Sequence, residues 1–197
     1  MAKAQKVPQR KRISDVNRMR ALAHPLRMAV LRHLMAVGPR TASECADEVG
    51  STPSNCSWHL RQLAAFGLVE PAESANERDR PWRATQVGLD FGELASDPVV
   101  REAQDSVIAV SLQDEAEMTR RFLDHRNDLD DEWVSAARLD SYVVRVTPAE
   151  LRELSKAMNE ILRPYVATVR PKSDDDALLA YVGLRAFPRL DATGTPT

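Results

Sequence analysis

The sequence predicts a mainly α-helical fold with a small amount of β-structure (α+β), and three observations lead to this class. Apolar residues recur at spacings of three and four over most of the chain, which is the period of an amphipathic helix. Capping residues, prolines and glycines mark where the helices of the first half start and stop. Alternating β-rich runs occur at only two places, after the fourth predicted helix and near the C-terminus.

Length and composition are those of a globular protein. At 197 residues and 43% hydrophobic content, the chain has room for one full domain and a smaller one. It contains no run of eighteen apolar residues, and "MAKAQKVPQRKR" at its start is polar and basic, so neither a membrane span nor a signal peptide is expected. The cytoplasm is the expected location, where Cys45 and Cys56 should be reduced thiols.

Charge is distributed unevenly along the chain. Residues 1–95 carry 14 Lys/Arg against 10 Asp/Glu, whereas residues 96–197 carry 13 against 19. A basic half joined to an acidic half suggests a module that faces nucleic acid, tied to one with another role. Residues 1–12 hold five basic side chains and are expected to be a disordered tail, which could lie along a phosphate backbone or remain solvated.

The first two helices are bounded by local signals. The helical pattern begins at Ile13, with Ser14 available as N-cap, and continues to about Ala23. His24-Pro25 then separates this helix from a second one, which should end at Gly38-Pro39.

Two further helices follow, with even clearer boundaries. Thr41 and Glu44 form a T-x-x-E capping box that starts a helix at Ala42, and Gly50 is expected to stop it. Thr52 is the predicted N-cap of the next helix, which should run from Pro53 to about Phe66. Two short helices joined by so tight a turn form a helix-turn-helix.

A β-hairpin is predicted directly after these helices. Its strands should cover Leu68 to about Ala72 and about Pro81 to Thr85, with a charged loop between them. A hairpin in this position is the wing of a winged helix. Residues 13–95 are therefore expected to form a winged helix-turn-helix domain.

Three motifs in this region carry a family resemblance. They are "ALAHPLRMAVLRHLM", the S-x-H-L-x-x-L-x-x-x-G-L-V run from Ser57 to Val69, and the closing wing strand "RPWRATQVG". In this order they resemble the ArsR-type winged helix-turn-helix transcription regulators over roughly residues 16–92. The resemblance implies a homodimeric, sequence-specific DNA-binding repressor or activator. The metal-sensing members carry a cysteine-rich motif where this chain has "TASECADEV", so no metal site and no cofactor are expected.

The predicted recognition helix has two faces. Cys56, Leu60 and Leu63 fall on one stripe and should be buried, while His59 is expected to be a partly buried structural residue. The opposite face and the wing supply the candidate contacts to double-stranded DNA. These candidates are Thr52, Pro53, Ser54, Ser57, Trp58, Arg61, Arg78, Arg80 and Arg83. Trp58 could instead pack against the wing, and each wing arginine could simply be solvated.

The second half is predicted to contain a long helix and a small β-α-β unit. Residues 96–130 read as the long helix, a natural dimerisation element that could also merely pack on its own domain. Residues 131–190 follow as a strand at "ARLDSYVVRVT", a helix opened by the Thr147–Glu150 capping box and a strand at "ALLAYVGLRAFP". Residues 191–197 should be a flexible tail. This half could complete the dimer, bind a small effector between subunits or dock another protein.

The residue patterns do not favour an enzyme. No nucleophile and base, glycine-rich phosphate loop or carboxylate pair occurs at a recognisable spacing. The leading hypothesis is thus a homodimeric DNA-binding regulator, expected to be a repressor acting on an inverted repeat. The alternatives are a winged helix used as a protein-interaction module and a thiol- or metal-responsive switch built on Cys45 or Cys56.

Overall fold

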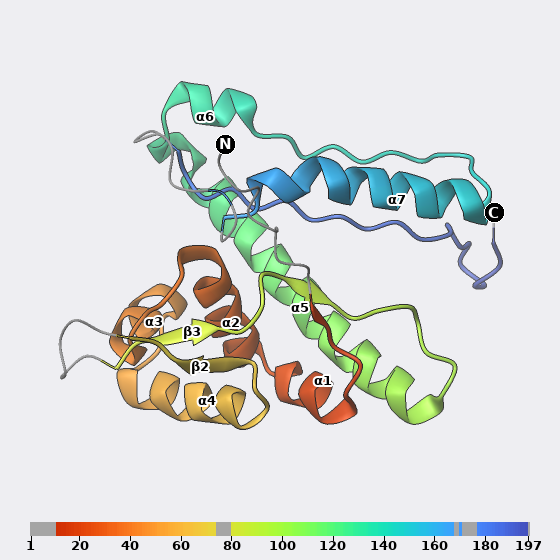
Figure 1. The fold of residues 1–197 in the computed structure, drawn as a ribbon. Coiled ribbons are helices and arrows are strands. Elements are labelled where there is room, and N and C mark those ends of the chain that lie inside the picture. Colours follow the sequence, from red (N-terminus) through yellow and green to blue (C-terminus); the bar gives the residue numbers. More distant parts are fainter. Residues whose placement is uncertain (1–10, 74–79, 168–169, 171–176, 197) are drawn as a thin grey trace, which may run out of the picture.

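The computed structural model of the chain describes residues 11–73, 80–167, 170 and 177–196, and helices dominate it (Figure 1). The α-helices are α1 (Val16–Leu22), α2 (Pro25–Val37), α3 (Ala42–Val49), α4 (Pro53–Ala65), α5 (Pro98–His125), α6 (Asp131–Ala136) and α7 (Pro148–Leu162). The strands are β1 (Lys11–Arg12), β2 (Val69–Pro71), β3 (Trp82–Ala84) and β4 (Leu89–Asp90). Short 3₁₀ turns at Arg126–Asp128 and Arg163–Tyr165 follow α5 and α7. The mainly α class with small β-structure is confirmed.

The helix boundaries follow the capping signals of the sequence. Thr41 Oγ1 accepts the Glu44 amide hydrogen bond while the Glu44 carboxylate accepts from the Thr41 amide, which completes the predicted capping box of α3. Gly50 ends α3 in the left-handed region at φ 61°, where a side chain would be strained. One cap differs from the prediction. Asp15, not Ser14, caps α1, because its carboxylate accepts from the Arg18 amide at 2.8 Å.

One hydrophobic core lies in the first half of the chain. It is built from α1 to α4, β2 and the first half of α5, and its largest fully buried side chains include Met19, Leu22, Met28, Leu31, Leu34, Leu60, Leu63, Leu68 and Val107. The N-terminal half of α5 closes this core, since Ala103 and Val107 are buried and Val100 and Val110 pack against it. This stretch of the long helix therefore packs on its own domain.

Two small sheets complete the winged domain. Strands β2 and β3 pair antiparallel, with Glu70 opposite Arg83, and form the predicted wing. The backbone of Arg40 extends this sheet through two hydrogen bonds to Trp82, at 2.8 and 3.0 Å. The second sheet corrects the expectation of a disordered tail over residues 1–12, because Lys11–Arg12 pairs in parallel with Leu89–Asp90. Residues 1–10 lie outside the described part of the chain.

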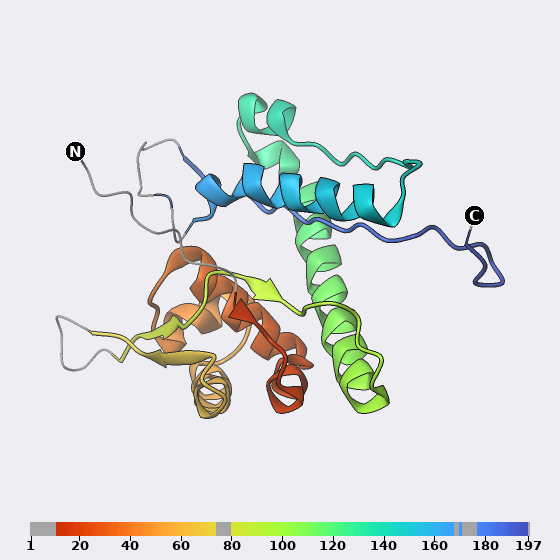
Figure 2. The ribbon, with the colours of Figure 1, turned by 45° about the vertical axis from the view of Figure 1, so that its right-hand side comes forward.

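The second half is built on the far end of α5, as two views of the ribbon show (Figures 1 and 2). The predicted helix after the Thr147–Glu150 capping box is confirmed as α7. The strands expected on either side of it are not formed. Residues 137–147 and 177–189 are extended and run along α7 without pairing, and a β-strand needs a neighbouring strand to satisfy its backbone groups. Among the described residues, no helix combines the length and the apolar composition needed to cross a membrane.

Candidate nucleic-acid interface

Helix α4 is held in place by its buried face and by its first turn. Cys56, Leu60 and Leu63 are fully buried, as the spacing predicts. Thr52 caps the helix, because its hydroxyl accepts from the Asn55 amide, and Pro53 occupies the first helical position. The helix is therefore fixed on the domain with its other face turned to solvent.

The solvent-facing side of α4 brings several predicted residues together. Ser54, Trp58 and Arg61 are exposed on this side, and Ser57 lies at its edge. Arg61 donates a hydrogen bond from Nη1 to Ser57 Oγ at 2.9 Å, one turn back on the same helix. The Arg61 side chain is exposed and its guanidinium has further N–H donors, so it can still bind a base edge or a phosphate.

Trp58 rests on a histidine pair. Its ring meets the His59 ring edge-on, with centroids 4.7 Å apart, and the His59 ring lies 4.6 Å from that of His24. The contact with His59 covers one side of the indole, while 47% of the residue stays exposed. Trp58 thus packs against His59, the core-facing residue next to it in sequence. Helical spacing did not predict this contact.

The two supporting histidines are neutral near pH 7. Burial lowers the pKa of both His24 and His59, and the nearby Arg27 lowers each further. The Nδ1 atoms of both rings are buried and have no hydrogen-bond partner among the residues that the structure describes. His59 is 4% exposed, more deeply buried than the sequence suggested.

The predicted wing residues differ in whether they are already paired with a carboxylate. Arg80 is exposed near the tip. Arg83 is exposed too, but it forms an ion pair with Glu70 across the hairpin, at 2.7 and 2.8 Å. Arg78 lies outside the described residues. Of the predicted wing contacts, Arg80 is therefore the one the structure leaves without a carboxylate partner among the residues it describes.

Asn55 belongs to the same surface and was missed in the sequence analysis. It is exposed in the first turn of α4, and its amide donates to Ser51 Oγ at 3.1 Å. An asparagine on a recognition helix can bond adenine through two hydrogen bonds. Its place in the first helical turn, next to the exposed Ser54, was the signal that could have identified it.

The two thiols lie on the opposite, buried side. Cys45 and Cys56 are both fully buried free thiols. Burial and the neighbouring Cys56 raise the pKa of Cys45 to about 12, and burial raises the pKa of Cys56 as well. Both groups are therefore protonated at neutral pH. Within the described ranges, no three His, Cys, Asp or Glu side chains converge as a metal site requires.

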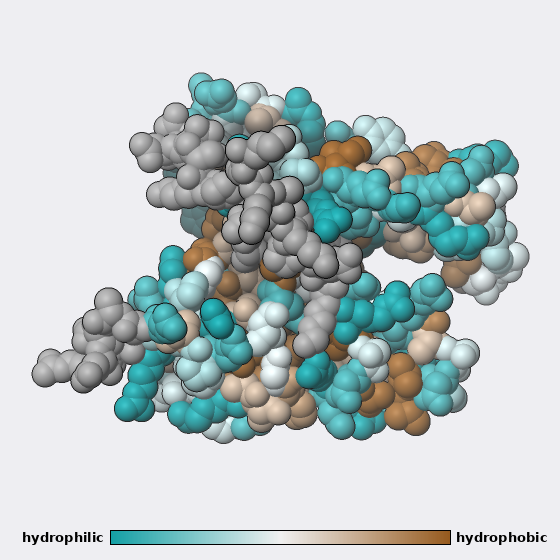
Figure 3. Space-filling model, in the orientation of Figure 1, coloured by the Kyte–Doolittle hydropathy of each residue, from teal (hydrophilic) through white to brown (hydrophobic). Residues whose placement is uncertain are grey.

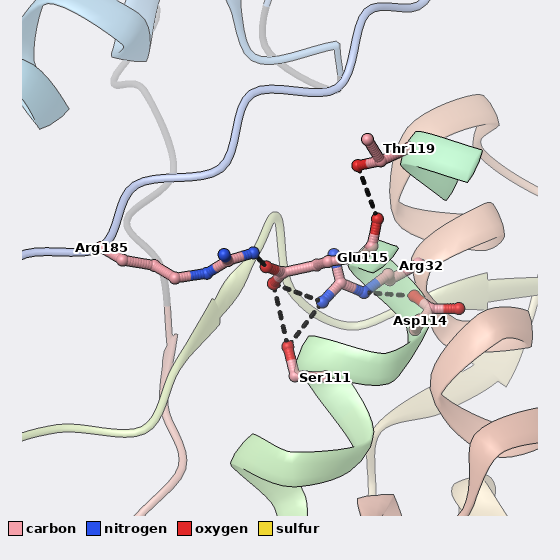
Figure 4. A network of polar contacts seen from close by, with 6 residues as sticks. All are labelled: Arg32, Ser111, Asp114, Glu115, Thr119 and Arg185. Carbon is pink, nitrogen blue, oxygen red and sulfur yellow. Dashed lines mark hydrogen bonds and ion pairs between the residues drawn. The ribbon is translucent and has the colours of Figure 1, made fainter. Parts of the chain in front are cut away.

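A polar network connects this domain to the second half (Figure 4). Arg32 of α2 donates to Ser111 Oγ at 2.6 Å and to Glu115 at 3.2 Å, both on α5. Its Nε lies 2.8 Å from Asp114 Oδ2, an ion pair whose angles do not suit a hydrogen bond. The other oxygen of Glu115 accepts from Arg185 of the C-terminal segment.

Charge balance explains the pKa values in the network. Burial alone would raise the pKa of Glu115, but hydrogen bonds from Arg185 and Arg32 together hold it below its usual value. Burial raises the pKa of Asp114 more than Arg32 lowers it. Arg32 thus helps to stabilise the ionised form of Glu115, but it offsets the burial of Asp114 only in part.

Comparisons with known proteins agree with this architecture at the level of the domain. Residues 22–72 match the protein family described as "Helix-turn-helix domain". No curated protein matches the sequence. Among solved structures, the chain is similar to a MarR family transcriptional regulator from Silicibacter pomeroyi, at 21% identity over 71% of this chain and 70% of that chain, with a TM-score of 0.29.

A second solved structure, RV1404 from Mycobacterium tuberculosis, is 15% identical over 80% of this chain and 85% of that chain, with a TM-score of 0.32. Residues 22–72 contain α2, α3, α4 and the first wing strand, and β3 completes the hairpin. The chain therefore carries a winged helix-turn-helix domain.

Proposed function

We propose that this protein is a DNA-binding transcriptional regulator that acts as a homodimeric repressor on an inverted repeat. The observation that carries the proposal is the solvent-facing side of α4, where Ser54, Trp58 and Arg61 lie on a helix whose opposite face is anchored in the core. A major groove admits one helix and presents a different pattern of donors, acceptors and methyl groups for each base pair.

Each exposed side chain suits a distinct contact. Arg61 can pair with the O6 and N7 atoms of guanine, Trp58 offers an apolar face to a thymine methyl, and Ser54 is small enough for close approach. Arg80 and Arg83 of the wing, together with Arg78, would bind phosphates. Phosphate contacts fix the position of the domain and make affinity depend on salt, whereas the α4 contacts select sequence.

The assignment to the ArsR type and the repressor role rest on the sequence motifs, since the family match is to the helix-turn-helix domain in general. The geometry of DNA recognition by a single short helix supports a homodimer. One short recognition helix contacts few base pairs, and two copies related by a two-fold axis double that number on an inverted repeat. Any small effector would act through the second half, which the Arg32 network joins to α2.

Selection from a random duplex pool with the full-length protein tests the proposal. We expect an inverted repeat whose half-sites are centred about one helical turn, roughly 34 Å, apart. Binding should weaken steeply with salt, as expected when several phosphates are contacted.

The matched variants are Arg61→Ala and Arg126→Ala, which remove the same charge from α4 and from the 3₁₀ turn that follows α5. Arg61→Ala should lower affinity for the selected site while Arg126→Ala leaves it unchanged. If no duplex is enriched over random DNA, the proposal is wrong. A flat salt dependence with a stable protein complex would instead support an interaction module.

A further inference from the structure

We propose that a second copy of this chain covers the apolar side of the C-terminal half, and that residues 139–146 and 178–188, here called the two arms, pair as strands with the arms of that copy. The inference rests on the proposed function in one respect, because it names the surface through which a homodimeric regulator would assemble. The arms, α7 and the total surface of the chain each support it.

The backbone of the arms is ready to pair. Both arms are extended and run along α7, one on each side of it in both views (Figures 1 and 2). Within the described part of the chain, no backbone hydrogen bond joins either arm to another segment. Extended chain with unpaired N–H and C=O groups is a template for a further strand.

The side chains of the arms are those of a sheet and not of a solvated linker. Tyr142, Val143 and Phe187 are 83%, 86% and 74% exposed. Other large apolar side chains on the arms are exposed as well: Val144, Val146, Leu178, Leu179, Tyr181, Val182 and Leu184. β-Branched and aromatic residues stabilise strands when cross-strand neighbours cover them. Among the residues that the structure describes, no strand pairs with either arm, so one copy supplies no cross-strand neighbour for these side chains.

Helix α7 is only partly covered. Its apolar residues Leu151, Leu154, Met158, Ile161 and Leu162 recur at helical spacing, yet Leu154 and Ile161 are exposed and the other three are half-buried. The surface view shows hydrophobic residues exposed over this part of the molecule (Figure 3). An amphipathic helix is stable in water mainly through the packing of its apolar face, so this face requires a cover.

The exposed surface of the whole chain is large enough to leave room for such a cover. One copy exposes 14,530 Å². A compact monomer of its 22.0 kDa mass would expose about 9,300 Å², so roughly 5,000 Å² is in excess. A standard interface buries a total of about 1,200–2,000 Å² and an obligate dimer more, counted over both partners. Only a fraction of the excess in each copy is needed to form a stable dimer.

Charge favours a second copy as the occupant. The second half of the chain is acidic overall, but residues 139–146 carry one Asp and one Arg, and residues 178–188 carry a single Arg. That arginine, Arg185, is paired with Glu115. Two identical copies can therefore bring their arms together without the repulsion that their acidic surfaces would cause elsewhere.

The second arm is also held in position before any partner binds. Arg185 is tied to α5 through Glu115, and the Tyr181 ring lies 5.9 Å from the guanidinium of Arg32. An edge that is already ordered loses less conformational entropy on pairing. The same contacts join the proposed interface to α2 of the DNA-reading domain.

Sedimentation equilibrium of the full-length protein, without DNA, tests the inference. We expect a dimer whose dissociation constant rises about tenfold or more in Val143→Asp and in Phe187→Asp, the scale of one lost interface contact. Leu94→Asp is the control, because Leu94 is 80% exposed but lies in the loop before α5. A monomeric wild type, or dimers equally strong in all three variants, would overturn the inference.

Amide hydrogen exchange distinguishes a second copy from pairing within one chain. Arm amides should be protected at high protein concentration and should lose that protection on dilution and in Val143→Asp. Protection that persists in the monomer would mean that the arms pair within their own chain, and the inference would be wrong. A dimer with protected arms that selects no DNA would refute the proposed function alone. A monomer that still selects a DNA half-site would refute this inference together with the proposed homodimer, while DNA binding by the winged domain would stand.

Discussion

Arg32 of α2 and Glu115 of α5 form an ion pair with a nitrogen-to-oxygen distance of 3.2 Å, although they are 83 positions apart in sequence. Glu115 simultaneously accepts a hydrogen bond from Arg185, so a single carboxylate joins the winged domain to the C-terminal segment. Arg32 is the less exposed of the two arginines, with 20% of its side chain accessible against 51% for Arg185. The two arginines should therefore contribute differently to stability.

Replacing Arg32 by Met should lower the free energy of unfolding by about 3 kcal/mol, because Asp114 and Glu115 would lose the cation that compensates their burial. Arg185→Met should cost less than about 1 kcal/mol, since its guanidinium is half exposed and screened by water. Urea denaturation of the two variants checks this order. Equal losses would show that the two arginines are equivalent.

Substitutions on the two faces of α4 should affect stability and DNA affinity separately. Leu60→Ala leaves a cavity in the core and should cost about 2–5 kcal/mol of stability. Trp58→Ala removes an exposed ring and should cost no more than about 1 kcal/mol, yet it should weaken binding to the selected duplex. Thermal unfolding and a gel-shift titration measure the two effects. A Trp58→Ala protein with full DNA affinity would remove this residue from the interface.

Stability should fall as the pH drops below about 6.5. Burial lowers the pKa of His24 and His59 from 6.5, so the unfolded chain binds protons at a pH where the folded chain does not. The contribution of these neutral rings to the free energy of unfolding is fully present above pH 6.5. It is lost as the pH falls towards their pKa values in the folded protein. Urea midpoints from pH 7.5 to 5.5 should decrease, with a smaller slope in His59→Gln. An unchanged slope would assign the effect to other groups.

Cys45 and Cys56 should react with a thiol reagent only when the protein unfolds. Both are fully buried and their pKa values are raised, that of Cys45 to about 12, so little thiolate is accessible at pH 8. A chromogenic disulfide reagent should modify neither in native buffer and both in denaturant. Rapid modification of the native protein, with a change in DNA binding, would instead support a thiol-responsive switch.

Local signals explain how much of the fold is predictable from the sequence. The capping boxes at Thr41 and Thr147, the Thr52-Pro53 start and the Gly50 stop each depend on a few neighbouring residues, and all four appear as predicted. The buried stripe of α4 follows from helical periodicity for the same reason. Such features need no knowledge of the rest of the chain.

Apart from the N-cap of α1 and the omission of Asn55, the errors involve contacts between distant parts of the chain. Pairing of Lys11–Arg12 with Leu89–Asp90 joins segments that share no sequence signal, so it could not be foreseen. The contact between the His59 and His24 rings, which lie beneath Trp58, is a tertiary contact of the same kind. In the C-terminal half the sequence pattern of strands is present, but a pattern does not specify which chain supplies the neighbouring strand.

The 28 residues of α5 form one continuous helix about 42 Å long, which begins in the core of the winged domain and ends beside α6. A continuous helix of this kind fixes both the separation and the relative orientation of the two parts of the chain at its ends. One residue inserted between Glu115 and His125 would turn the DNA-reading head by about 100° relative to the C-terminal half, while four inserted residues, about one turn, would nearly restore its direction. Recognition of two half-sites on one side of a duplex should therefore vary periodically with the length of α5.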